Sequence, residues 1–560
     1  MRPTQSIHAL FAVLLACAAA FSCPAQTIEQ TPPNIVWLSV EDMSPWIGPY
    51  GDDTVPTPNL DRLAARGLVY ENAFATSPVC APARSSLITG MYATRIGSMQ
   101  MRNGRRSRAA GPGEYDGIPA YEAVPPAFVR CFPEHLRAAG YYCTNNSKRD
   151  YQFKEPVTVW DQTSNKAHWR NRAEGQPFFA VFNYTGTHES RAFPNRNQGQ
   201  GELDPGDAPV PPIYPDTPEV RDAMARTYNN IAAMDHWVGQ KIEELEEAGL
   251  LEQTVVMFFS DHGVGLPRGK RSCYDTGLRV PLIVRFPDGR RAGEREGRVA
   301  EFVDFGPTVL SLAGIEPDRR LDGAAFLGEF ARDEPGYAFG HGDRFDSIYE
   351  QTRTVSDGRY RYTRNLRTDV PYILRVRYRE QLPMTADIYA LQRTGPQAPE
   401  QWQLAATRRP AEEFYDSASD PWEVNNLIDD PRHAARIAEM RQTLGQWIQD
   451  TGDLGLILPE SKMVAEKLWP PDGVQPTTPA AQIQIATLEA ASDHTYAVTI
   501  TCDQPGASIG YRMSNTQAFN GPWNVYTKGP APLAGEGFIQ VRTHRIGHRP
   551  STVVIQVGPE

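Results

Sequence analysis

Short apolar segments of this chain end directly in ionisable side chains, and this feature restricts the fold more than any other. NIVWLSV (34–40) is followed by Glu41 and Asp42, and TVVMFFS (254–260) is followed by Asp261 and His262. Both segments have the composition of buried strands, and segments with the periodicity of amphipathic helices lie between them. This alternation predicts an α/β protein with a large and mostly parallel sheet.

Two further predicted strands lead to ionisable side chains in the same way. PFFAVFNY (177–184) leads through a short turn to His188, and GYYC (140–143) leads through TNNS to Lys148. Any one of these cases has an ordinary explanation as a cap or a turn. Because the carboxyl ends of strands in an open α/β sheet form the ligand crevice, the four together predict a common site.

The carboxylates expected in this crevice are suited to a metal ion. Glu41, Asp42 and Asp261 offer oxygen ligands, which hard divalent cations prefer, and His262 is a less typical fourth ligand. The sequence therefore predicts a site for calcium, with magnesium as the second choice.

Cys80 stands out in SPVCAPARSSLITG (77–90), near the start of a predicted helix with Pro82 in its first turn and Gly90 at its end. The positive end of a helix binds anions and acidifies thiols. The alternative is a buried apolar cysteine or half of a disulfide. Of the seven cysteines, five lie outside the N-terminal leader; they are widely spaced and odd in number, so they form no obvious disulfide framework or zinc pattern.

The N-terminus predicts an exported protein. MRPTQSIHALFAVLLACAAAFSCPAQ has the pattern of a signal peptide, placed at residues 1–25, and implies a periplasmic or secreted location. LLAC, ending at Cys17, is alternatively a lipoprotein cleavage site. No later segment has the roughly 20 apolar residues of a transmembrane span. A formal charge of −11 argues against nucleic-acid binding by bulk charge.

A different pattern begins after the proline-rich stretch that starts at Trp469. TYAVTITC, SIGYRMS, FIQVRTHRIG and TVVIQV alternate with turn signals and predict a β-sandwich at residues 480–560. Its motif spacing resembles the C-terminal β-modules of chitobiase-like glycan enzymes. Contact with a polysaccharide and a passive stabilising role both remain open.

The segment Cys80-Ala81-Pro82-Ala83-Arg84 matches the C-x-P-x-R signature of type I sulfatases, in which the cysteine is converted to formylglycine. The chain resembles this family over about residues 33–450, and the other motifs fall in the family's order: NIVWLSVED, TPNLDRLAARG, GTH (186–188), TVVMFFSDHG, GKRSCYDTGLRVPLIVRFP and FYDSASDPWEVNNL. The resemblance implies an alkaline-phosphatase-like fold, with a large mixed sheet flanked by helices in a catalytic domain (30–345) and a smaller α+β subdomain (346–468).

The resemblance also implies a set of roles. Hydrated formylglycine at position 80 supplies the nucleophile, and a formylglycine-generating enzyme is needed as a maturation partner. A metal held by Glu41, Asp42, Asp261 and His262 polarises the sulfate. The remaining roles are orientation of residue 80 by Arg84, charge neutralisation by Lys148 and Lys270, and protonation of the leaving group by His188.

Two departures from the family pattern affect this assignment. Glu41 stands where family members often have Asp, which puts its direct ligation in question. The family commonly has a histidine two residues after the lysine, but this chain has Lys148-Arg149-Asp150. His168 is the predicted substitute base that drives sulfate release, and a structural role for this histidine is the alternative.

The segment GHGDRFDSIYEQTR resembles part of the heparan N-sulfatase-like branch and contains Asp343, Arg344 and Asp346. These residues are predicted to contact a saccharide, or else to form an ordinary ion-paired loop. The expected function is hydrolysis of O- or N-linked sulfate from a sulfated saccharide or polysaccharide. The alternatives are a phosphodiester or phosphonate ester hydrolase and a catalytically silent glycan-binding homologue.

Overall fold

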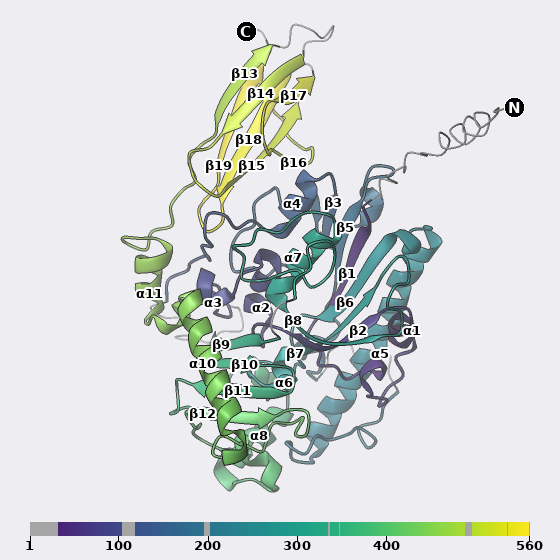
Figure 1. Cartoon of the computed structure of the whole chain (residues 1–560), viewed down its shortest axis with the longest axis vertical. Helices are drawn as coiled ribbons and strands as arrows, with labels where there is room; N and C mark the ends of the chain where they lie inside the picture. The colour runs from purple at the N-terminus through teal and green to yellow at the C-terminus, as the bar shows by residue number, and fades with distance from the viewer. Residues whose placement is uncertain are drawn as a thin grey trace, which may run out of the picture. The chain divides into compact units, whose positions relative to one another are not determined.

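The buried strands predicted at 34–40 and 254–260 lie side by side at the centre of an eight-stranded sheet (Figure 1). The strand order is β4-β3-β5-β1-β6-β7-β2-β8. β7 runs antiparallel to both neighbours and the other pairs are parallel, so the sheet is mixed. The strands are β1 (Asn34–Val40), β2 (Leu68–Phe74), β3 (Tyr142–Asn146), β4 (Gln162–Thr163), β5 (Phe178–Tyr184), β6 (Thr254–Ser260), β7 (Arg279–Arg285) and β8 (Arg295–Glu301).

Helices cover both faces of this sheet, because alternate residues of the central strands point to opposite sides. Val36 and Leu38 of β1 belong to one apolar cluster, and Ile35 and Trp37 belong to another. The first cluster includes residues of α1 (Pro58–Ala65), α5 (Pro218–Glu247) and α8 (Met384–Thr394). The second includes residues of α2 (Cys80–Thr89), α4 (Phe132–Ala138) and α7 (Phe302–Leu312).

A second, antiparallel sheet has the strand order β12-β11-β10-β9. The long helix α10 (Ala434–Thr451) packs its apolar side on this sheet, with Leu444 in the same cluster as Val355 and Phe414. Since β9 pairs with β10, this sheet begins at Ala338, before the boundary expected at residue 346. The strands are β9 (Ala338–Phe345), β10 (Ile348–Ser356), β11 (Tyr360–Asn365) and β12 (Glu412–Asp416).

The C-terminal segments form a β-sandwich, in agreement with the alternating pattern of the sequence. One sheet has the order β13-β14-β17 and the other β16-β15-β18-β19, with Val498 and Val541 in the core between them. The strands are β13 (Gln482–Thr487), β14 (Thr495–Thr501), β15 (Ala507–Ser514), β16 (Asn524–Val525), β17 (Ala531–Ala534), β18 (Gly537–Arg545) and β19 (Ser551–Val557). The remaining short α-helices are α3 (Ala93–Ile96), α6 (Asp275–Leu278), α9 (Trp402–Ala405) and α11 (Glu460–Met463).

The computed structural model describes residues 32–103, 118–194, 196, 202–333, 336–346, 348–487, 495–534 and 536–558. The predicted signal peptide at residues 1–25 lies outside them. Among the described residues, the helices are all too short or too polar to cross a membrane.

Candidate active site

The ends of β1 and β6 bring four of the predicted site residues together. Val40 and Ser260 pair in register at the strand ends, so Glu41 and Asp42 emerge next to Asp261 and His262. Asp42 takes up a left-handed backbone conformation with φ of 52°, and its N–H donates to Asp261 Oδ1 at 3.1 Å. The turn after β1 is thereby fixed to the turn after β6, which places both carboxylates in one buried cluster.

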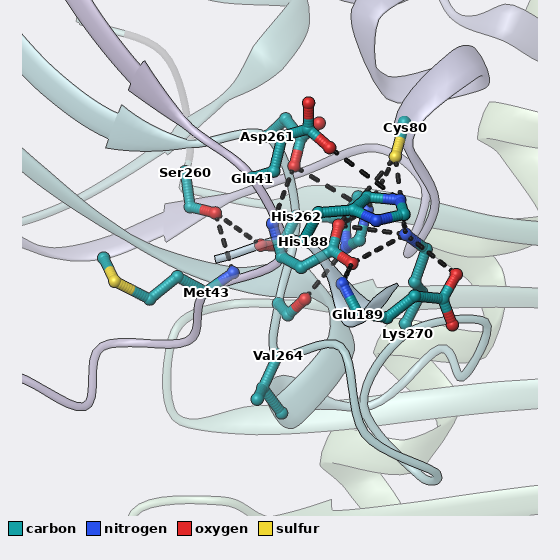
Figure 2. Close-up of polar contacts among 12 residues, drawn as sticks. Glu41, Met43, Cys80, His188, Glu189, Ser260, Asp261, His262, Val264 and Lys270 are labelled. Carbon is teal, nitrogen blue, oxygen red and sulfur yellow. Dashed lines mark hydrogen bonds and ion pairs between the residues drawn. The ribbon is translucent and has the colours of Figure 1, made fainter. Parts of the chain in front are cut away.

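Cys80 is the first residue of α2, and its thiol faces this cluster (Figure 2). The sulfur lies 3.3 Å from His262 Nε2, 3.6 Å from Lys270 Nζ and 3.9 Å from Asp42 Oδ1. Although it lies at the start of a helix, the residue is only 1% exposed. The loops after β1 and β6 enclose it, which the sequence pattern did not reveal.

Arg84 lies one turn into α2 and connects this helix to two strand ends. Its Nε donates to Asp261 Oδ2 at 3.0 Å, and Nη1 donates to Asn183 Oδ1 at 2.8 Å. Burial lowers the pKa of Arg84, but the charges of Asp261 and Glu41 and of further acidic neighbours together outweigh it, and the net effect is a rise. Arg84 therefore holds the start of α2, and with it residue 80, against the end of β6.

Two lysines balance the carboxylates from opposite sides. Lys270 Nζ lies 2.7 Å from Asp42 Oδ2, and Lys148 Nζ lies 3.0 Å from Glu41 Oε2. Burial lowers the pKa of Lys270, but the charges of Asp42, Cys80 and Glu189 together raise it to well above its ordinary value. The pKa of Lys148 is also raised, because the charges of Cys80 and Glu41 outweigh burial. Both ammonium groups remain charged at neutral pH.

His188 reaches the cluster from the turn after β5. Its Nδ1 accepts a hydrogen bond from the Ser190 N–H at 3.2 Å, so the neutral ring carries its proton on Nε2. Nε2 lies 3.3 Å from Lys270 Nζ and 3.8 Å from Glu41 Oε2. Burial and the charge of Lys270 lower the pKa of His188. Its side chain keeps 20% of its surface exposed, so the ring lies at the edge of the buried cluster.

The donor set fits a divalent cation. Ligand atoms of Asp42, Cys80, Asp261 and His262 all lie within 4.8 Å of one another. His262 Nδ1 lies 2.9 Å from the carbonyl oxygen of Gly263, and donation there leaves Nε2 facing the carboxylates. Burial lowers the pKa of His262, but the charges of Asp261 and Asp42 raise it to about 10. The crowded carboxylates thus draw a proton onto His262, where a cation would balance the same charge.

Glu41 is turned toward a different part of this cluster. Its ligand atom lies within 4.8 Å of those of Asp42, Cys80 and His188. Asp261 and His262 belong instead to the second set of neighbouring ligand atoms. Its Oε2 forms the ion pair with Lys148 described above. The additional methylene of Glu41 thus places its carboxylate on the Lys148 side of the cluster.

His168 is not among the residues that the structure brings together. Its Nε2 contacts Glu244 Oε2 at 3.0 Å, and its ring packs against Trp169 and Phe182. The expectation that it serves as the substitute base is therefore replaced by a structural role, in which it caps the short helix at Trp169–Asn171 and pairs with α5.

Asp150, in the place of the missing histidine, does reach the site. Its Oδ2 lies 3.5 Å from Lys148 Nζ and 3.5 Å from Arg102 Nη1. Burial raises the pKa of Asp150, but the charges of Lys148 and Arg102 hold it at about 2. The carboxylate is ionised and can orient Lys148. Its position two residues after Lys148 was the signal that could have identified it.

Two of the three residues predicted to contact saccharide are wholly buried. Asp343 and Arg344 are both 0% exposed; Asp343 pairs with Arg353, and Arg344 pairs with Glu460. The interpretation as substrate contacts is wrong for these two, because their polar atoms are used inside the second sheet. Asp346 keeps 19% of its side chain exposed and accepts from Arg271 Nε at 2.9 Å.

A salt bridge beside Lys270 was not predicted from the sequence. Arg271 donates through both terminal nitrogens to the two oxygens of Glu189, at 2.9 Å each, and Glu189 Oε1 lies 3.2 Å from Lys270 Nζ. Burial raises the pKa of Glu189, but the charges of Arg271 and Lys270 hold it well below its usual range. The sequence could have indicated these two residues, because each directly follows a predicted site residue: Glu189 follows His188, and Arg271 follows Lys270.

Comparisons with known proteins identify the family. The sulfatase family model matches residues 33–165 and 144–315. An ulvan-active sulfatase of Formosa agariphila is 40% identical over 93% of this chain and 91% of its own length. The chain therefore belongs to the sulfatase family, whose members are sulfuric ester hydrolases.

More distant relatives are consistent with this placement. The human N-sulphoglucosamine sulphohydrolase is 27% identical over 84% of this chain and 98% of its own. A solved structure of a protein with its substrate D-glucosamine-2-N,6-O-disulfate has a TM-score of 0.52 at 16% identity, covering 75% of this chain and 98% of that chain. A phosphonate monoester hydrolase from Silicibacter pomeroyi has a TM-score of 0.52 at 18% identity, covering 76% and 97%. These similarities between structures confirm the predicted α/β fold with its large mixed sheet.

Proposed function

We propose that this protein hydrolyses O- or N-linked sulfate groups from a sulfated saccharide or polysaccharide. The observation that carries the proposal is the position of Cys80, which begins a helix with its sulfur 3.3 Å from His262 and 3.6 Å from Lys270. The relatives point to the substrate class, since they include an ulvan-active sulfatase and a protein solved with a disulfated glucosamine as its substrate.

The nucleophile of this proposal is Cys80 after conversion to formylglycine by a maturation enzyme. The hydrated aldehyde supplies two hydroxyls on one carbon, one for attack on sulfur and one for release of sulfate. Serine and unmodified cysteine each lack the second hydroxyl. The surroundings suit this group, because ammonium and imidazole groups lie within hydrogen-bonding reach of residue 80.

The proposed metal is Ca²⁺, with Mg²⁺ less favoured, held by Asp42, Asp261 and His262 with Glu41 at the edge. A bound cation polarises a sulfate oxygen and favours ionisation of a neighbouring hydroxyl. The oxygen-rich donor set supports a hard cation.

The remaining side chains would manage charge and protons. Lys148 and Lys270 neutralise the sulfate oxygens, and Arg84 keeps residue 80 in place through its bond to Asp261. His188 would donate a proton to the leaving oxygen, because its ring lies beside Lys270 at the partly exposed edge of the cluster. Asp346 is the one predicted saccharide contact with accessible surface.

Export through the signal at residues 1–25 agrees with a polymeric substrate outside the cytoplasm, and the lipid-anchored form is the second possibility for the N-terminus. The proposal includes neither nucleic acid nor a transmembrane span.

Metal depletion and a matched pair of substrates test the proposal. Protein from a host with the maturation enzyme is assayed on the sulfate ester and the phosphate ester of one alcohol, before and after chelation. We expect faster sulfate release, at least tenfold loss of turnover on chelation, and recovery with Ca²⁺. Preference for the phosphate ester would favour the alternative hydrolase, and metal-dependent binding without turnover would favour the silent homologue.

A further inference from the structure

The four-stranded sheet of the β-sandwich has an outer face that the hydrophobic core does not use. Ile509, Tyr511 and Met513 of β15, and Ile539 and Val541 of β18, belong to the core between the two sheets. Because side chains alternate along a strand, Arg512 of β15 and Gln540 and Arg542 of β18 lie on the opposite face. On β19 the same face includes Val554, which is 43% exposed.

Two arginines on this outer face stack on one tryptophan. The Cζ atoms of Arg512 and Arg542 lie 4.4 Å and 5.0 Å from the ring centre of Trp523, at the edge of β16. Arg512 pairs across from Gln540 and Arg542 from Gly510, which makes the two arginines diagonal neighbours on the sheet. The tryptophan thus holds two like charges close together.

Neither guanidinium has a carboxylate partner among the described residues. Arg512 donates to Gln540 Oε1 and to the Gly521 carbonyl oxygen, and Arg542 donates to Thr552 Oγ1. Burial lowers the pKa of both groups, and for Arg512 the charge of Arg542 adds to the effect. In a chain with a formal charge of −11, this is a local surplus of positive charge that an anionic ligand would relieve.

The patch formed by Arg512, Arg542 and Trp523 lies next to the part of the sandwich that contacts the catalytic body, by which we mean the part of the chain built around the first two sheets. Arg137 of α4 donates to the Trp523 carbonyl oxygen at 2.5 Å, which fixes the tryptophan backbone. A Cβ at Gly510 would lie 2.7 Å from Val157 Cγ2, so the sheet touches the catalytic body just beside Arg542. The patch is consequently anchored to the catalytic body, and a chain bound to it would be held beside the enzyme.

We propose that Arg512, Arg542 and Trp523 form an auxiliary binding site for a sulfated polysaccharide, separate from the catalytic cluster. Stacked guanidinium groups offer paired N–H donors to sulfate oxygens, and the neighbouring Gln540 and Thr552 offer hydrogen bonds to sugar hydroxyls. The site would raise the local concentration of polymer without taking part in hydrolysis. The identity of the anion rests on the proposed function; the presence of an anion site does not.

The test uses full-length protein with Arg512→Gln and Arg542→Gln together, which keeps part of each side-chain stem. The matched control is Lys528→Gln with Arg549→Gln, two exposed cations of the same module. Mobility is measured in native gels that contain ulvan, dextran sulfate or neutral dextran. We expect the Arg512/Arg542 variant to bind both sulfated polymers about tenfold more weakly and the control to change less than twofold. Added salt should weaken wild-type retention.

Activity separates this proposal from the proposed function. On a small sulfate ester, both variants should match wild type, whereas the Arg512/Arg542 variant should show a higher KM on polymer only. Unchanged retention, or equal loss in the control, would overturn the auxiliary site. Normal retention in a protein with no sulfate ester hydrolysis would leave the auxiliary site standing and reject the proposed function. A thermal midpoint within about 2 °C of wild type excludes unfolding as the cause.

Discussion

Two buried clusters of charge in this protein differ in how completely their charges are matched. In the second sheet, Arg353 uses all three guanidinium nitrogens, with Asp343 and Asp453 as its carboxylate partners and backbone carbonyls as the others. Around Cys80, in contrast, Asp42 and Asp261 lie close enough to hold the pKa of His262 at about 10. In the first cluster the two carboxylates both pair with one guanidinium, whereas in the second Asp42 and Asp261 both lie near the His262 ring and favour a proton or a cation there.

This difference explains why burial and charge alone do not mark a functional site. Asp343 and Arg344 carry charged groups like those around Cys80, but each is buried and paired with an oppositely charged side chain inside the second sheet. Like charges held together at strand ends are the more informative feature. The comparison predicts that substitutions in the first cluster affect stability and that substitutions in the second affect turnover.

The largest effect is expected for Cys80→Ser, which keeps nearly the same shape but lacks the second hydroxyl. We expect kcat/KM on a sulfate ester to fall roughly 1,000-fold or more, with little change in thermal midpoint. Mass analysis of the 77–90 peptide should show the aldehyde in wild-type protein only. Cys502→Ser, in the β-sandwich, is the control and should remain active. A fully active Cys80→Ser enzyme would contradict the nucleophile assignment.

Arg353→Met should have the opposite effect. Removing this cation leaves two buried carboxylates without their partner, which costs about 3–5 kcal/mol of unfolding free energy. The folded fraction should keep kcat/KM within about threefold. Urea unfolding followed by activity at low urea checks both values. The exposed pair Arg367–Asp369 gives the control, since Arg367→Met should cost less than about 1 kcal/mol. If Arg353→Met lost activity without losing stability, the distinction between a structural and a functional cluster would be wrong.

Asp343 gives the second sheet a specific response to acid. Burial raises its pKa, but Arg353 and His341 hold it below the ordinary value, so its contribution to stability is present above about pH 4 and is lost as the pH falls further. Asp343→Asn should be about 3 kcal/mol less stable at pH 6, and this difference should narrow by pH 3. Unfolding curves at pH 6, 4 and 3 measure it. A constant difference would show that the charge of Asp343 is not responsible.

The smallest effect is expected for His168→Gln. Its contacts are with Glu244 and two aromatic rings, so kcat/KM should change less than about twofold over the whole pH range. Asp150→Asn is the informative comparison, because Asp150 contacts Lys148 and should lower kcat/KM by about tenfold. A large effect of His168→Gln would restore it as a candidate base.

Much of the fold could be read from the sequence because local patterns determine it. The strands 34–40 and 254–260 begin and end where the apolar runs do, and α5 begins at Pro218 after its Thr217 cap, as the helix signals indicate. The expected division at residue 346 was less successful, because it falls between β9 and β10, which pair directly with Phe345 opposite Ile348. Consecutive strands with a short connection commonly form a hairpin, so the sequence did carry a signal for this pairing.

For the site residues, local patterns could not reveal partners that are distant in sequence. Strand-end positions located Glu41, Asp42, Asp261 and His262 because sheet topology converts them into neighbours. The interpretations of His168 and of Asp343 with Arg344 went wrong because the partner that occupies each one, such as Glu244 or Arg353, is distant in sequence. Tertiary contacts alone decide whether a carboxylate is already paired with a cation or is available to a ligand.

The enclosure of Cys80 has a consequence for how active enzyme is produced. With 1% of the residue accessible, the maturation enzyme of the proposed function would have to reach the cysteine before the chain has folded around it. Under that proposal, conversion and folding would compete, and a molecule that folds first would keep an unconverted Cys80. The specific activity of a preparation would consequently record the ratio of two rates during synthesis, and slower folding would yield more active protein from the same gene.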